Sequence, residues 1–239
     1  MTRLAALLAF AAACSVPALD LANKQCPCAD GYTCDDSSNT CVPRGSDSGD
    51  AGTSCIGSVP GMQLYSDDFS AATIDSRWVT SAMWSQTGGA LVQSDPNDQL
   101  AVAYTTAVTT SSYRVVANLT GTAGGTGLGI AVRVSETGKT QYDCLWEPGT
   151  TTGVLILQST NNGGQGSTIT SQVGLPSGGA AATVTMEMLA NGGLQCCLDG
   201  VPGATVEISS PTPSYPTGQP GLVTDRMQAS FRDFAVYAN

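Results

Sequence analysis

The stretch YRVVANLTGTAGGTGLGIAVRV, residues 113–134, decides the fold class of this chain. Apolar side chains alternate with polar or small ones along 113–119 and again along 128–134, and the segment between these two runs is rich in glycine. Period-2 alternation places every second side chain on one face of a strand, and a short glycine-rich break is typical of the turn between two strands. The stretch therefore predicts two antiparallel strands, each with one buried face.

The same rhythm extends over residues 62–239. Short apolar runs recur at about 8 to 15 residues, turns rich in Gly, Pro and Asn separate them, and no window has a helical period. Residues 184–188 and 194–198 alternate in the same way. We expect about 12 to 14 strands, which is too many for an immunoglobulin-type domain and fits two packed antiparallel sheets. The predicted fold class is therefore all-β, with a two-sheet antiparallel sandwich over 62–239.

The composition excludes several classes of function. The 239 residues include 9 Lys and Arg against 19 Asp and Glu, a net charge of −10, and no histidine. Without an imidazole the chain cannot form a Ser-His-Asp or Cys-His hydrolase site or a His-ligated zinc site. Nucleic-acid binding relies on clustered Lys and Arg that neutralise phosphates, and the two lysines of this chain are Lys24 and Lys139. We therefore expect no nucleic-acid partner.

The N-terminal segment 1–18 is typical of an export signal. A single arginine precedes an apolar run over 4–13, which is too short to span a bilayer. The run ends in Ala-Ala-Ala-Cys14, which resembles a bacterial lipobox and implies that Cys14 is lipidated in a cell-envelope lipoprotein. Ordinary cleavage after Ala13 or Ala18, which would release a secreted soluble protein, is the alternative. We expect contact with a membrane only through a lipid anchor.

A cysteine-rich mini-module is predicted over 19–43, followed by a flexible linker rich in Gly, Ser and Asp over 44–61. The spacing C-x-C-x5-C-x6-C covers about sixteen residues, too few to bury a core, so crosslinks are expected to order the module. A zinc site is the alternative. The part from Cys28 to Cys34 resembles the end of an EGF-like repeat. Export favours disulfides, and the candidate cysteines are Cys26, Cys28, Cys34, Cys41, Cys55, Cys144, Cys196 and Cys197.

The adjacent cysteines Cys196 and Cys197 constrain the disulfide pattern of the sandwich. Neighbouring strand residues point to opposite faces, and a bond between the two would need a strained ring. We therefore expect them to have different partners. Cys144 would bond to one of them inside the sandwich, and Cys55 would bond to the other and fasten the linker. A reactive vicinal dithiol is the alternative.

Segments at both ends of the sandwich resemble one fold family. The matching sequences are LYSDDF at 64–69, IDSRW at 74–78, GAL at 89–91, QPGL at 219–222 and ASFRDFAV at 229–236. In this order and separation they resemble concanavalin A-like lectin/glucanase, or laminin-G-like, jelly-roll domains, which implies a jelly-roll sandwich. Some relatives hold calcium near the paired first and last strands, and this implies Asp67, Asp68 and Asp233 as candidate calcium ligands.

The same fold family includes laminarinase-type glycoside hydrolases, so catalysis has to be considered. Those enzymes carry their carboxylates in Glu-x-Asp-x-x-Glu on one strand. That motif is absent here, since the four glutamates lie at least eleven residues apart. A carboxylate pair from other positions, such as Asp143 with Glu147 or Glu187, stays open. We lean towards a protein that is not an enzyme.

Residues 141–147, QYDCLWE, supply both the aromatic rings and the polar groups that a glycan site needs. Strand alternation divides this set, because Tyr142, Cys144 and Trp146 share one face and Asp143 lies on the other. Core packing is the alternative role of the aromatic face. The candidate ligand-binding residues are Trp84, Arg133, Tyr142, Asp143, Trp146 and Glu147, with Gln158 as a polar neighbour.

The predicted function is a secreted or surface-anchored binding module that is not an enzyme and recognises a polysaccharide or a surface protein. The missing glycosidase motif and the anchor-like N-terminus favour this interpretation. A glycoside hydrolase with a non-standard carboxylate pair and a structural envelope protein are the alternatives.

Overall fold

The protein is described from a computed structural model. It covers residues 61–81, 83–121, 126–149, 151–164, 166–176, 182–189 and 191–239, together with the backbone of 32–35 and 40–43. The chain divides into two compact units, residues 1–51 and 52–239. In the first unit β1 (Tyr32–Asp35) and β2 (Thr40–Pro43) form an antiparallel pair in which Cys34 lies opposite Cys41.

Several predictions concern segments outside the described residues. They are the export signal, lipidation at Cys14, most of the linker, and the bonds of Cys26, Cys28 and Cys55. Within the described residues, no helix has both the length and the apolar character needed to cross a membrane.

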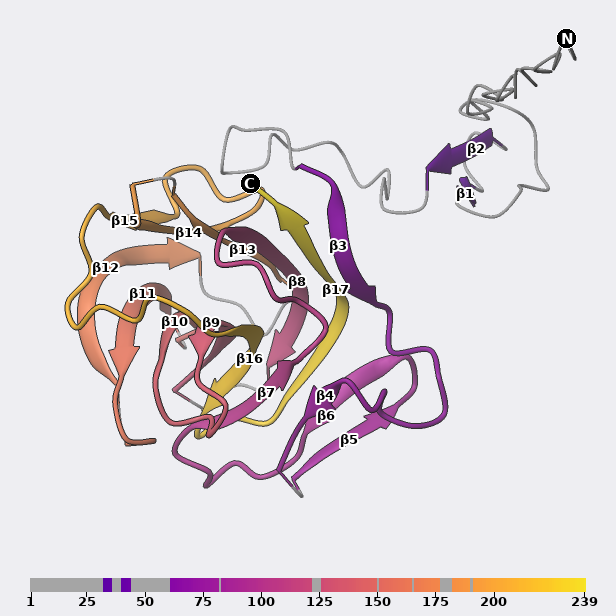
Figure 1. Cartoon of the computed structure of the whole chain (residues 1–239), viewed down its shortest axis with the longest axis horizontal. Coiled ribbons are helices and arrows are strands. Elements are labelled where there is room, and N and C mark those ends of the chain that lie inside the picture. Colours follow the sequence, from indigo (N-terminus) through magenta and orange to yellow (C-terminus); the bar gives the residue numbers. More distant parts are fainter. Residues whose placement is uncertain are drawn as a thin grey trace, which may run out of the picture. The chain divides into compact units, whose positions relative to one another are not determined.

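The second unit is an all-β sandwich of two antiparallel sheets (Figure 1). The seven-stranded sheet has the order β12-β11-β10-β9-β16-β7-β4. Its strands are β4 (Trp78–Val79), β7 (Ala101–Thr105), β9 (Gly127–Val134), β10 (Gln141–Glu147), β11 (Thr152–Thr160), β12 (Ser167–Pro176) and β16 (Gln219–Asp225).

The eight-stranded sheet has the order β15-β14-β13-β8-β17-β6-β5, with β3 also paired to β17. Its strands are β3 (Gln63–Asp67), β5 (Trp84–Thr87), β6 (Ala90–Gln93), β8 (Tyr113–Gly121), β13 (Ala182–Met188), β14 (Leu194–Leu198), β15 (Thr205–Ile208) and β17 (Ala229–Ala238). The predicted all-β, two-sheet antiparallel jelly-roll sandwich is confirmed. The two sheets together have fifteen strands, slightly more than the sequence rhythm indicated.

The core lies between the sheets, where the alternating apolar side chains of residues 113–134 meet. Val115 and Leu119 from β8 and Ile130 and Val132 from β9 are each at most 1% exposed and belong to one apolar cluster. Full burial of such side chains contributes about 1.5 to 3 kcal/mol each. The period-2 pattern therefore identified the inward face of β8, and that of β9 as far as Val132. Val134 belongs to a second apolar cluster, because the chain departs from regular strand geometry at Arg133, whose φ is 57°.

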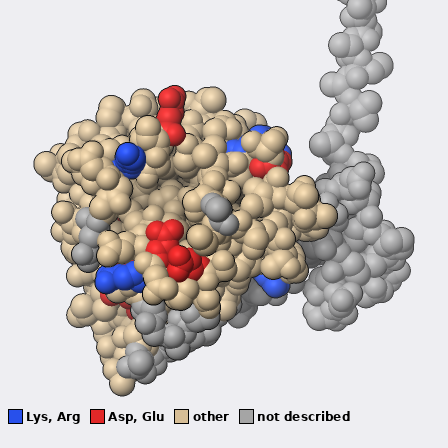
Figure 2. Space-filling model, turned by 90° about the horizontal axis from the view of Figure 1, so that it is seen from below, with Lys and Arg blue, Asp and Glu red and all other residues tan. Residues whose placement is uncertain are grey.

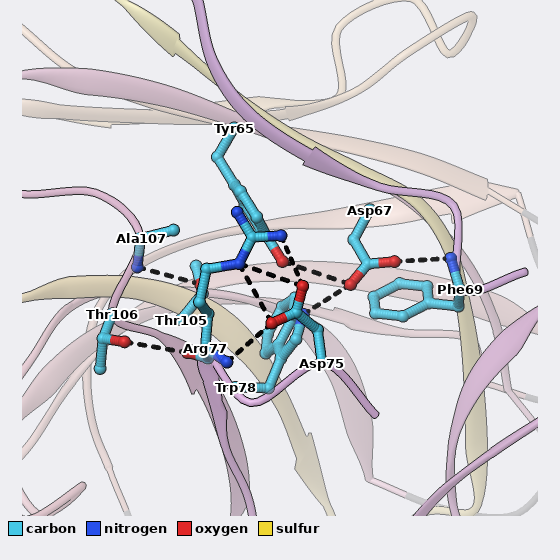
Figure 3. A network of polar contacts seen from close by, with 9 residues as sticks. All are labelled: Tyr65, Asp67, Phe69, Asp75, Arg77, Trp78, Thr105, Thr106 and Ala107. Atoms are coloured by element: carbon cyan, nitrogen blue, oxygen red, sulfur yellow. Dashed lines mark hydrogen bonds and ion pairs between the residues drawn. The ribbon is translucent and has the colours of Figure 1, made fainter. Parts of the chain in front are cut away.

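Three of the segments that carried the family resemblance, 64–69, 74–78 and 229–236, contact one another at one corner. Figure 3 shows the first two. Asp67 accepts hydrogen bonds from the Trp78 Nε1 at 2.9 Å, from the Phe69 amide at 2.8 Å and from the Tyr65 hydroxyl at 3.2 Å. The Trp78 ring also packs edge-on against Phe234, with 4.9 Å between centroids. These contacts join the opening of the fold to β17, which runs beside β3 (Figure 1).

A disulfide bond crosses the core between the two sheets. It joins Cys144 of β10 to Cys196 of β14, and both residues are fully buried. The neighbouring Cys197 is also disulfide-bonded. Because Cys196 is bonded to Cys144, the bond of Cys197 is to another cysteine. This confirms the prediction that the two adjacent cysteines, which point to opposite faces of the strand, have different partners, one of them Cys144. The predicted role of Cys55 lies outside the described residues.

The outer face of the seven-stranded sheet carries a second, smaller apolar cluster. Its buried members are Tyr104, Ala131, Val134, Leu145 and Val223. Side chains at six consecutive positions of β10, residues 141–146, are consequently buried, although they alternate between the two faces of the sheet. This outer face is filled by the protein's own side chains in the region where β10 runs.

Candidate functional site

The three aromatic residues predicted to contact a ligand lie in the core. Trp84, Tyr142 and Trp146 are 5%, 2% and 5% exposed. The Trp84 ring packs 5.7 Å from Phe231, between centroids. The Trp146 ring covers Gly153 so closely that an added Cβ would lie 1.8 Å from the ring. Core packing, and not a platform for sugar rings, is the role that the structure gives these three residues.

The predicted polar ligand-binding residues are also wholly or partly buried. Asp143 is fully buried. Arg133 has a φ of 57°, and its Nε lies 2.8 Å from the sulfur of Met188, a core residue of the opposite sheet. Glu147 is half-buried, and burial together with the nearby Asp225 raises the pKa of its carboxyl. The six candidates do not form one exposed site.

The three candidate calcium ligands have hydrogen-bond partners of their own. Asp67 accepts from the Trp78 ring nitrogen and from the Phe69 amide, as described above. Asp68 accepts from the Ser70 amide at 2.9 Å, and Asp233 accepts from the Asn118 side chain at 2.9 Å. Asp67 lies opposite Phe234, so β3 and β17 do bring the acids near each other in the sheet. The described residues nevertheless contain no group of three or more His, Cys, Asp or Glu that could hold a metal ion.

A cavity of about 550 Å³ opens at one end of the seven-stranded sheet. Three segments surround it, namely 108–111 after β7, the β9–β10 turn with its flanks, and 215–219, which leads into β16. Antiparallel pairing brings these strand ends together. The lining residues are Val108, Thr109, Thr110, Ser111, Val134, Ser135, Glu136, Thr137, Thr140, Tyr215, Pro216, Thr217, Gly218 and Gln219.

Tyr215 is held at the cavity by the core residue Tyr142. The Tyr215 amide donates to the Tyr142 hydroxyl at 2.8 Å, and that hydroxyl donates to the Pro213 carbonyl at 2.6 Å. The two rings lie 4.8 Å apart, and the Tyr215 hydroxyl donates to the Thr160 carbonyl at 2.8 Å. Tyr142, predicted as a ligand contact, is therefore the anchor of the segment that carries the cavity's aromatic ring.

The backbone at the cavity wall needs a glycine. Gly218 has a φ of 148°, and an added Cβ would lie 2.3 Å from the carbonyl carbon of Arg133. The Tyr113 hydroxyl bridges the same two residues, since it accepts from the Arg133 amide at 3.2 Å and donates to the Gly218 carbonyl at 3.3 Å. On the other side, the Tyr104 hydroxyl donates to the Glu136 carbonyl at 2.6 Å. Core tyrosines thus fix two of the three segments.

The chemistry of the lining is that of hydroxyl groups. Seven of its residues are Ser or Thr, one is the partly exposed Tyr215, and the single charged residue is Glu136. Hydroxyls both donate and accept hydrogen bonds, and a tyrosine adds an apolar ring face. Figure 2 shows a face of the molecule on which charged side chains are sparse. Such a cavity suits a neutral, hydroxyl-rich ligand.

Sequence reasoning missed Tyr215. The signal that could have found it is the segment SPTPSYP, residues 210–216, in which a lone aromatic residue stands in a proline-rich loop before a strand. Loops positioned by a rigid scaffold often carry binding residues.

The chain matches no family model and no curated protein. Among solved structures, the carbohydrate binding module CBM66 from Bacillus subtilis is 14% identical at a TM-score of 0.57, over 68% of this chain and 96% of that one. A Bacillus subtilis protein of unknown function with a galectin-like fold is 14% identical at a TM-score of 0.56, over 75% and 97%. A laminarinase from Flavobacterium sp. UMI-01 is 10% identical at 0.52, over 73% and 99%. At these identities the likeness shows the fold alone.

Proposed function

We propose that the protein is an exported carbohydrate-binding module whose binding site is the cavity between segments 108–111, 134–140 and 215–219. The observation that carries the proposal is the lining itself, a rigidly anchored ring of Tyr215 surrounded by seven Ser and Thr residues. Ligand sites combine an apolar surface with a few well-placed polar groups. The core disulfide fits an oxidising compartment.

The charge of the lining selects neutral glycans over acidic ones. No Lys or Arg lines the cavity, Glu136 does, and the chain carries a net charge of −10. Like charges disfavour association and lower its rate. Among the structures of similar fold, one is named a carbohydrate binding module and another a laminarinase. Neutral polysaccharides, β-glucans included, are the ligand class that we propose.

A binding panel on the full chain tests this function. Titration calorimetry against neutral glucans, fructans and xylans, with uronate polymers for comparison, should give binding to a neutral member only. Tyr215→Ala should weaken that binding at least about tenfold, a loss expected for one stacking ring. Tyr237→Ala, which alters a partly buried tyrosine on β17 outside the cavity, is the matched control and should leave it unchanged. Binding that survives Tyr215→Ala, or no binding to any glycan, would overturn the proposal. Runs with and without calcium test the calcium candidates Asp67, Asp68 and Asp233.

One observation favours a glycoside hydrolase as the second candidate. Asp225 lies opposite Gly127, and an added Cβ at Gly127 would lie 3.4 Å from the Glu147 Cγ, so a residue without a side chain separates the two carboxylates. The raised pKa of Glu147 suits a general acid. The pair Asp143 and Glu187 is not favoured, because the two residues lie in different sheets and Glu187 is bonded to Arg114 at 3.1 Å. Asp225 is itself paired with Arg226 at 3.1 Å but lies in the same sheet as Glu147. Release of reducing ends from a glucan, lost in Glu147→Gln, would establish the hydrolase.

A further inference from the structure

We infer that Asp143 is a positioning residue of the cavity, and that gain or loss of its proton changes how firmly the segment 209–218 holds Tyr215. This inference rests on the proposed function for its importance to binding, but its contacts lie within the described residues and are testable without a ligand. The carboxyl group of Asp143 does not itself line the cavity.

Asp143 is fully buried without a cation. Its carboxyl oxygens accept from Gln141 Nε2 at 2.7 Å, from Thr160 Oγ1 at 2.7 Å and from Gln158 Nε2 at 3.3 Å. Among the described residues it forms no ion pair. The titratable groups that act on it are Asp225 of β16 and Tyr215, while its nearest residue on β9, Ala131, carries no charge. Three neutral donors alone compensate the ionised carboxylate.

Thr160 connects this carboxyl to the cavity. Its hydroxyl donates to Asp143, and its carbonyl accepts from the Tyr215 hydroxyl at 2.8 Å. The residue beside Asp143 on β10 is Tyr142, whose hydroxyl accepts from the Tyr215 amide. Asp143 is thus linked to both ends of the Tyr215 residue, once through Thr160 and once through its own strand. A change in how the carboxyl holds Thr160 reaches Tyr215 through one hydrogen bond.

The network has a second bonded arrangement. Gln141 Oε1 is buried and has no hydrogen-bond partner while its Nε2 donates to Asp143. A protonated carboxyl becomes a donor, and rotation of the Gln141 amide would let Oε1 accept from it. Gln141 bonds Oδ1, whereas Thr160 and Gln158 both bond Oδ2. A proton on Oδ1 therefore leaves both donors in place but makes their acceptor neutral, which weakens the bond from Thr160. Burial raises the pKa of Asp143 to about 6, so the exchange between the two arrangements falls in mildly acidic solution.

Hydrogen exchange of the full chain, followed by mass spectrometry from about pH 4.5 to about pH 7.5 and corrected for intrinsic exchange, tests the inference. Peptides over 209–218 should lose protection about fivefold as the pH falls through about 6, which corresponds to one hydrogen bond. Asp143→Asn, a neutral group at every pH, should show the low protection throughout. Thr160→Val removes the hydroxyl that donates to Asp143 and keeps the carbonyl that accepts from Tyr215, so it should abolish the pH step, although loss of this donor also raises the pKa of the carboxyl.

Asp225→Asn is the control, because removing a nearby negative charge should lower the midpoint of the step and leave its size unchanged. Equal protection of 209–218 across the pH range in the wild type, or the same step in Thr160→Val, would overturn the inference. If the step is found but no glycan binds, the proposed function fails and the positioning role stands. If a glycan binds but the step is absent, the reverse holds.

Discussion

Replacing both Cys144 and Cys196 by alanine removes the covalent link between β10 and β14 and leaves the bond of Cys197 in place. A disulfide stabilises a fold chiefly by restricting the unfolded chain, and the effect grows with the length of the loop that it closes. Here 52 residues separate the two cysteines. We expect the double variant to fold into the same sandwich with a lower free energy of unfolding.

The loop-closure relation gives the size of the loss. A loop of 52 residues corresponds to about 14 cal/mol/K of chain entropy, or about 4 kcal/mol at 25 °C. Both sulfurs also lie in the core at no exposure, so their removal adds a packing loss of the same sign. Against a usual total stability of about 5 to 15 kcal/mol, a loss of about 4 kcal/mol leaves a folded variant whose free energy of unfolding is clearly smaller.

Urea unfolding of both proteins under non-reducing conditions, followed by tryptophan fluorescence, measures this difference. If the bond acts through the unfolded chain, the m-value should rise in the variant, because the freed chain exposes more surface. A loss of about 4 kcal/mol with an unchanged m-value would place the effect in the packed core instead. A loss below about 1 kcal/mol would refute the entropic reasoning altogether.

Three further predictions concern single residues. Burial raises the pKa of Asp143 from 3.8 to about 6, so the folded protein binds this proton more tightly than the unfolded chain does. The protonated carboxyl therefore stabilises the fold fully below about pH 4, and about 3 kcal/mol of the free energy of unfolding is lost as the pH rises through about 6. Urea unfolding should show this slope in the wild type and not in Asp143→Asn. Gly153→Ala drives a methyl group into Trp146 and should cost about 1 to 3 kcal/mol, and a thermal midpoint unchanged within error would contradict that packing. Asp67→Asn turns an acceptor towards the Trp78 N–H into a competing donor and should cost about 1 to 3 kcal/mol, which a double-mutant cycle with Trp78→Phe should assign to that contact.

The sandwich could be predicted from the sequence because alternation reports burial wherever one face of a strand is buried and the other is not. That condition holds for β8, where Val115 and Leu119 are buried while Thr120 is exposed. It fails on β10. On the outer face of β10, Leu145 packs in the second apolar cluster, and Asp143 is buried among the polar side chains that donate to it. Both faces of the strand are therefore buried. A polar residue in a strand then no longer marks the solvent side.

The cavity could not be predicted, because its parts come from loops whose placement depends on distant contacts. Tyr215 is fixed by Tyr142, 73 residues earlier in the chain, and the glycine at 218 is fixed by Tyr113, 105 residues earlier. Local periodicity carries no information about such pairs. Of the aromatic residues that stood out in the sequence, Tyr142 is the anchor, and Tyr215, which it anchors, lies in an irregular segment.

The burial of Trp84, Tyr142 and Trp146 in the core limits the affinity of the proposed site, because these rings cannot contact a ligand. Tyr215 is the single aromatic residue of the lining, so one ring and a few hydroxyl contacts have to supply the affinity for a glycan. Net contributions of about 1 kcal/mol for each hydrogen bond leave a monovalent complex weak. Many copies on one surface would compensate, because linked binding events multiply at high effective concentration. The lipid anchor predicted at Cys14 and the linker predicted over 44–61 would provide that display.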